Sequence, residues 1–165
     1  MKLKNAIIVK SSLNTNLINY LFIVIVLKTI FNIIRKKDKQ GLTMSTIKEY
    51  LSMDHGRCDE LFANMEDAVA KSIESAKDAY EEFAKSTERH FQMEERVMFL
   101  EFEQKTGMTQ GPTAMMRHEH AQMRNLIAEM GKAIEAKDKD KFFGNSETLM
   151  ILMQQHNMKE EQMLY

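Results

Sequence analysis

The chain has 165 residues and a net charge of −1, with 23 basic residues, 24 acidic residues and one cysteine. This length favours a single domain. One cysteine permits neither an internal disulfide nor a cysteine-based zinc site, which fits a reducing compartment. In residues 44–165, acidic residues outnumber basic ones by 23 to 15. Such a composition without a basic stripe argues against nucleic-acid binding, and no phosphate-binding glycine motif occurs.

Residues 1–43 form a basic and apolar N-terminal extension, with eight Lys or Arg residues and a single acidic one. Residues 17–34 are mostly apolar, but polar residues and Lys28 interrupt them. A membrane-spanning helix needs about 20 predominantly apolar residues, and a central lysine makes insertion less favourable. The extension is therefore either a marginal membrane anchor, which would keep the following domain in the cytoplasm, or an upstream extension ahead of a working start at Met44.

Residues 44–165 are predicted to fold as an all-α, antiparallel up-down-up-down four-helix bundle. Gly107 is expected to end the second helix, and Pro112 to open the third, because proline at the first helical position loses no hydrogen bond. Long helices with short connections predict this architecture. Apolar residues recur at helical spacing in four stretches: 47–69, 75–104, 112–134 and 141–165.

Two histidines are followed by a glutamate four residues later: His90 by Glu94, and His156 by Glu160. Residues four apart share one helix face, so each pair can point toward a single centre. The first predicted helix supplies His55. The third supplies His118 or His120, which cannot both face one centre because they are two residues apart.

The positions of these histidines along their helices agree. With turns expected near residues 73, 108 and 137, four histidines lie 17–19 residues from the turns at one end of the bundle: His55, His90, His120 and His156. At about 1.5 Å per residue, they differ in level by only a few ångströms. Amphipathic patterning does not require this agreement, so it predicts a shared metal site. His120 gives better register than His118. A metal-free bundle with ordinary histidines is the alternative.

Four imidazoles and two carboxylates are too many ligands for one tetrahedral zinc ion, and they suit iron. Two bridging glutamates, four imidazoles and an oxo or hydroxo bridge would fill about ten of the twelve positions of two octahedral ions. The remaining positions would admit a small exogenous ligand. Ferritin-like bundles use Glu-x-x-His, but no histidine of this chain has glutamate three residues before it.

The ordered motifs Asp54-His55, His90-x3-Glu94, Glu119-His120 and His156-x3-Glu160-Glu161 resemble the hemerythrin-like (HHE cation-binding) family over residues 46–165. The resemblance implies a non-haem di-iron centre with His55, His90, His120 and His156 as terminal ligands and Glu94 and Glu160 as bridges. Oxygen-carrying members have a His-x3-His pair on the third helix, where this chain has Met116 and Arg124 at those spacings. The chain is similar to the H–HxxxE–H–HxxxE subgroup, which includes iron or redox sensors and proteins that handle peroxide or nitric oxide.

We therefore expect a cytoplasmic non-haem di-iron protein that binds dioxygen or a related small molecule for sensing, storage or delivery. One alternative is a di-iron enzyme, an oxidoreductase acting on peroxide or nitric oxide. The other is a metal-free helical interaction bundle. The expected partner is a diatomic or peroxide ligand, without nucleic acid, and residues 17–34 are the only segment suited to membrane contact. Cys58 is expected to be a small buried hydrophobe.

Overall fold

The structure is a computed structural model that describes residues 47–164. The predicted membrane anchor or upstream extension falls in residues 1–43, outside the described residues, and the domain boundary before Met44 stays a prediction. None of the helices in the described part of the chain has the length and hydropathy of a membrane-spanning segment.

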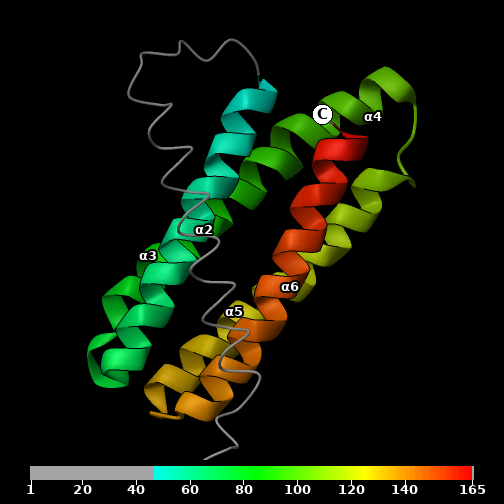
Figure 1. Cartoon of the computed structure of the whole chain (residues 1–165). Coiled ribbons are helices and arrows are strands. Elements are labelled where there is room, and N and C mark those ends of the chain that lie inside the picture. Colours follow the sequence, from blue (N-terminus) through cyan, green and yellow to red (C-terminus); the bar gives the residue numbers. More distant parts are fainter. Residues whose placement is uncertain (1–46, 165) are drawn as a thin grey trace, which may run out of the picture. The chain divides into compact units, whose positions relative to one another are not determined.

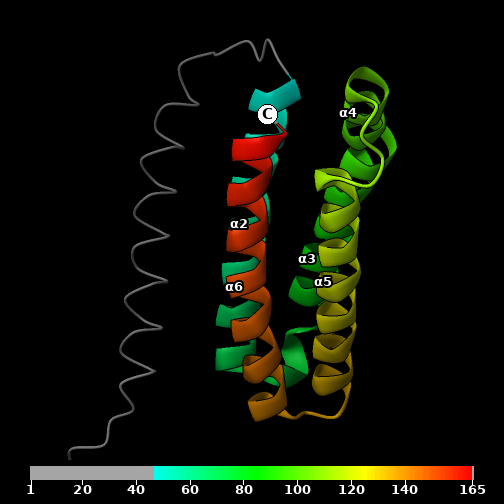
Figure 2. The same ribbon diagram turned by 90° about the vertical axis from the view of Figure 1, so that its right-hand side faces the viewer.

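Four long helical rods form an antiparallel bundle, as predicted (Figure 1). Three elements, α3, η2 and α4, run on from one another and make up the second rod. Around the bundle, α2 packs against α3 and α6, and α5 packs against α6 and α3 (Figure 2). The elements in chain order are α2 (Ile47–Lys71), the short 3₁₀ helix η1 (Ile73–Ser75), α3 (Lys77–Met93), the π-helical η2 (Glu94–Met98), α4 (Phe99–Thr106), α5 (Pro112–Glu135) and α6 (Lys139–Met163).

The helix ends follow from local chemistry. Gly107 adopts a left-handed conformation, with φ of 71°, and its N–H donates to the Glu103 carbonyl, which ends α4. Pro112 occupies the start of α5. The Asp138 carboxylate accepts a hydrogen bond of 2.9 Å from the Lys141 backbone N–H and so caps α6. The predicted ends near 107 and 112 are confirmed.

Buried apolar side chains form two clusters, one toward each end of the bundle. The larger, here called the closed-end core, lies toward η1 and the turn between α5 and α6, and it includes Phe62, Phe83, Met130, Phe142 and Leu149. The smaller, here called the cap cluster, lies toward the turn between α4 and α5. Its buried members are Leu51, Met98, Phe99 and Met116. On α2, on the second rod and on α5, the predicted metal ligands lie between residues of these two clusters. On α6 they lie between Met153 of the closed-end core and Leu164, a partly buried residue that packs against the cap cluster.

Candidate metal centre

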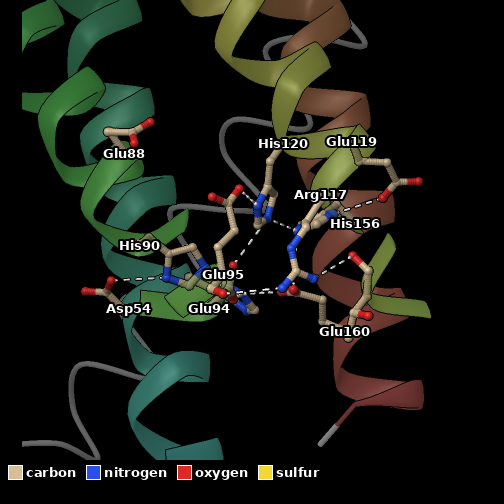
Figure 3. A network of polar contacts seen from close by, with 12 residues as sticks. Asp54, Glu88, His90, Glu94, Glu95, Arg117, Glu119, His120, His156 and Glu160 are labelled. Carbon is tan, nitrogen blue, oxygen red and sulfur yellow. Dashed lines mark hydrogen bonds and ion pairs between the residues drawn. The ribbon is translucent and has the colours of Figure 1, made fainter. Parts of the chain in front are cut away.

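The structure brings all six predicted ligands together in a layer of buried polar side chains, and Figure 3 shows most of this network. They form two groups of potential ligand atoms, each within 4.8 Å of one another, and both groups share Glu94 and Glu160. The first group adds His55 and His90, and the second adds His120 and His156. Every one of the six is at most 5 % exposed.

Each shared carboxylate presents one oxygen to each pair of histidines. Glu94 Oε1 lies 3.0 Å from His90 Nε2, and its Oε2 lies 3.3 Å from His120 Nε2. Glu160 Oε2 lies 3.4 Å from His55 Nε2, and its Oε1 lies 3.5 Å from His156 Nε2. All four imidazoles thus point Nε2 inward, and the two glutamates connect the two halves.

The π-helical segment η2 begins at Glu94, and the two consecutive glutamates Glu94 and Glu95 contact histidines on different rods. A π-turn inserts an extra residue into a helix, which rotates the following residues relative to regular α-helical spacing. Glu94 begins this segment and contacts His90, one turn earlier. Glu95 accepts a hydrogen bond of 2.8 Å from His120 Nδ1 on α5. Helical spacing in the sequence gives no indication of this local widening.

Each histidine also contacts a second carboxylate through its outer nitrogen, Nδ1. Each of these four carboxylates lies on one rod and contacts the histidine of the next rod. The contacts run from α2 to the second rod, then to α5, to α6 and back to α2, so the carboxylates form a ring around the bundle. We call them the acid ring. The contacts are Asp54 with His90 at 3.2 Å, Glu95 with His120 at 2.8 Å, Glu119 with His156 at 2.9 Å, and Glu161 with His55 at 3.4 Å.

This arrangement orients the imidazoles for metal binding. An Nδ1–H that donates to a carboxylate fixes the tautomer, so Nε2 carries a lone pair and becomes a better ligand. His120 Nε2 and His156 Nε2 lie only 2.9 Å apart, so a proton between them can form a hydrogen bond. In those tautomers both nitrogens offer a lone pair to one cation instead.

Basic side chains hold three members of the acid ring in place. Arg89 donates to Asp54 at 3.0 Å, and Lys159 donates to Glu119. Arg124 donates to Glu95 at 2.8 Å and also to Glu88 at 2.7 Å. These bonds keep the carboxylates ionised, and the pKa of Glu95 accordingly lies below its ordinary value, despite burial that opposes the shift.

The buried ligands strongly influence one another's protonation. Burial alone would lower the pKa of His55, but Glu160 and Glu94 outweigh it and raise that pKa to about 10. Burial also opposes a charged His90, yet Asp54 and Glu94 raise its pKa. In the same way, burial disfavours ionised Glu94, and the surrounding histidines nevertheless hold its pKa far below the usual range. Without metal, protons on the imidazoles balance the carboxylates, and cations would replace them.

The donor atoms fit a metal pair. Both carboxylate oxygens of Glu160 are buried and lie 3.4 and 3.5 Å from His55 Nε2 and His156 Nε2, at the outer limit of hydrogen-bond length. The layer is therefore not a tightly closed hydrogen-bond network. Imidazole nitrogen with carboxylate oxygen is a donor set that suits iron and similar transition metals.

Other sequence expectations can now be placed. His118 is exposed and contacts Gln122, so the structure puts His120, and not His118, in the cluster. Cys58 is buried in the closed-end core, as expected. The roles of Glu95, Arg124 and Lys159 were missed. For the acid ring the sequence did offer one signal, since each of its four members is next to a predicted ligand in the sequence.

The fold and this site define a helical bundle whose buried histidine and glutamate clusters can hold metal. The family model of the hemerythrin HHE cation binding domain matches residues 46–165, and the chain therefore belongs to this family. Comparison with curated proteins and with solved structures gave no significant match.

Proposed function

We propose that this protein binds two iron ions as a non-haem pair and uses them to bind dioxygen or a related small molecule, for sensing, storage or delivery. His55 and His90 would hold one ion, and His120 and His156 the other. Glu94 and Glu160 would bridge them. Bound iron supplies reversible coordination and redox chemistry, while the chain's own residues position the ligands and exclude water. The absence of a second cysteine supports a cytoplasmic setting for this function.

The observation that carries the proposal is the sharing of Glu94 and Glu160. Each directs its two oxygens toward different histidine pairs, at 3.0 to 3.5 Å from Nε2. A single ion would not need two carboxylates split in this way. Four imidazoles and two bridging carboxylates leave positions of an octahedral pair for an exogenous ligand.

The surroundings of the layer favour an uncharged ligand. Met123 and Met153 of the closed-end core flank the ligands along the chain on one side, and Met116 and Phe99 of the cap cluster flank them on the other. Apolar walls make the entry of an anion costly, because a charge would lose its hydration. A diatomic molecule such as dioxygen or nitric oxide meets no such penalty.

Metal analysis of the full chain, loaded with ferrous iron without oxygen, tests the proposal. We expect about two iron ions per chain, loss of at least one of them in His120→Ala, and full retention in His118→Ala. The two variants are matched, since the substituted histidines are two residues apart on the same helix and only one reaches the cluster. Wild-type protein that binds no iron, or equal losses in both variants, would overturn the proposal.

Stopped-flow absorbance separates binding from turnover. Mixing the ferrous protein with dioxygen should give an adduct that is reversed by purging. Continuous consumption of peroxide or nitric oxide over many equivalents would instead identify the alternative, a di-iron oxidoreductase.

A further inference from the structure

The acid ring supports the two halves of the metal centre unequally. This inference rests on the proposed function, since it concerns two metal positions whose ligand sets are alike in composition. Each position has two histidines and shares the same two glutamates. Any difference between them must come from the groups around the ligands.

The half formed by His120 and His156 is held firmly. Their Nδ1 atoms lie 2.8 Å from Glu95 and 2.9 Å from Glu119, which are normal lengths for strong hydrogen bonds. The Glu119 side chain is only 11 % exposed and contacts Lys159. The His120 ring also stacks on Phe91, with ring centroids 4.1 Å apart. Both imidazoles are therefore fixed in position before any ion arrives.

The half formed by His55 and His90 is held less firmly, and Glu161 is its weak point. The contact from His55 Nδ1 to Glu161 is 3.4 Å, the longest in the acid ring. The Glu161 side chain is 47 % exposed, and within the described chain no lysine or arginine side chain contacts it. His90 has better support, at 3.2 Å from Asp54, which Arg89 holds. Water competes for an exposed carboxylate, so Glu161 orients its histidine less strictly.

The partner of the outer imidazole nitrogen sets both ring orientation and ligand basicity, and removing it typically weakens metal binding about 10- to 100-fold. We propose that the two metal positions are inequivalent. The His120–His156 position fills first and keeps its ion. The His55–His90 position fills second and exchanges its ion with solution, and Glu161 is the positioning residue that sets its weaker affinity.

Anaerobic titration of the metal-free full chain with cobalt(II), followed by its visible absorption, tests this proposal. The wild-type protein should bind two ions in separate steps that differ about tenfold or more in affinity. Glu161→Gln should weaken the second step alone. Glu119→Gln should weaken the first step about tenfold or more and bring the two steps together. Both substitutions remove one charge from a member of the acid ring and replace no predicted metal ligand.

A second pair of variants locates the tight ion. His55→Gln should retain one tightly bound cobalt ion, whereas His156→Gln should retain only weak binding. Circular dichroism of each variant checks that the helices persist. If Glu119→Gln does not fold, this pair decides the question alone.

The outcomes separate the two proposals. Two ions bound with equal affinity, or loss of the first step in Glu161→Gln, would overturn the inequivalence and leave the two-ion centre standing. Wild-type protein that binds fewer than two ions would overturn the two-ion centre, and the inequivalence with it.

Discussion

The two ends of the bundle are built from the same four rods but packed to very different extents. Seventeen buried residues make up the closed-end core, against four in the cap cluster. The ligand layer separates them, so it has a thick apolar wall on one side and a thin one on the other.

Exposed apolar side chains show the same asymmetry. Among the described residues, ten large hydrophobic side chains are exposed, and all except Ile151 lie at or beyond the ligand layer on the cap side. Examples are Met53, Val97, Leu100 and Met158. From this comparison we expect the closed-end core to supply most of the stability, and the cap cluster to control how easily metal ions reach the ligands.

Matched truncations of two fully buried phenylalanines test this division most strongly. Phe83 belongs to the closed-end core and Phe99 to the cap cluster. Burial of a phenylalanine side chain is typically worth about 3–5 kcal/mol against alanine. We expect a loss near the upper limit for Phe83→Ala, because its neighbours cannot fill the cavity, and near the lower limit for Phe99→Ala. Urea unfolding measures both.

Metal release provides the second measurement for these variants. Phe99→Ala should speed the loss of bound metal to a chelator, because only a thin cap then separates the ligands from solvent. Phe83→Ala should leave the release rate close to that of the wild type. Equal acceleration in both variants would contradict the assignment of access to the cap end.

The pH dependence of stability tests the ligand layer between the two ends. Neighbouring carboxylates raise the pKa of His55 from its ordinary value of 6.5 to about 10. The ion pairs of His55 therefore stabilise the metal-free fold fully when the pH is below that ordinary pKa, and this stabilisation is lost as the pH rises toward 10. We expect a loss of about 2 kcal/mol between pH 7 and 9, because each pKa unit corresponds to about 1.4 kcal/mol. Urea unfolding with a chelator present measures this loss.

Bound metal should reverse that trend, because ions replace the imidazole protons and bind more tightly as pH rises. The His118→Ala variant should follow the wild type, and His55→Gln should flatten the dependence of the metal-free protein. A metal-free wild type that is as stable at pH 9 as at pH 7 would count against these ion pairs.

The sequence predicts the rods and their turns well, because the signals are local. Gly107 and Pro112 mark helix ends through backbone geometry that depends little on the rest of the fold. The similar spacing of the histidines from the turns predicts that His55, His90, His120 and His156 lie at one level of the bundle. The structure brings these four side chains together. That they bind metal stays a prediction until metal is measured.

The acid ring and η2 were not predictable in the same way. Asp54 and Glu119 are adjacent to ligands in the sequence, but they serve histidines on neighbouring rods. Which rods are neighbours depends on packing around the whole bundle. The π-helical turn at Glu94–Met98 has no sequence signature of its own.

Close packing at the closed end can be tested at Gly131 on α5. A Cβ atom there would lie 2.4 Å from the Tyr80 hydroxyl, which donates to the Ile127 carbonyl at 3.0 Å. Gly131→Ala should displace Tyr80 and cost about 1–2 kcal/mol, despite the better helix propensity of alanine. Gly144→Ala on α6 is the control, because its Cβ would meet nothing within 4 Å. Thermal unfolding should show the control to be at least as stable as the wild type.

The smallest effects are expected at the turns, where each end of the bundle has one residue with positive φ. Gly107 at the cap end has φ of 71°, and Lys137 at the closed end has φ of 56°. A side chain in this region is disfavoured by about 1 kcal/mol relative to glycine. Gly107→Ala should therefore destabilise the protein by about 1 kcal/mol, and Lys137→Gly should be neutral or slightly stabilising. If thermal unfolding instead shows that Gly107→Ala is as stable as the wild type, the cap-end turn must be able to rearrange. The backbone of this turn would then be loosely packed, like the side chains of the cap cluster.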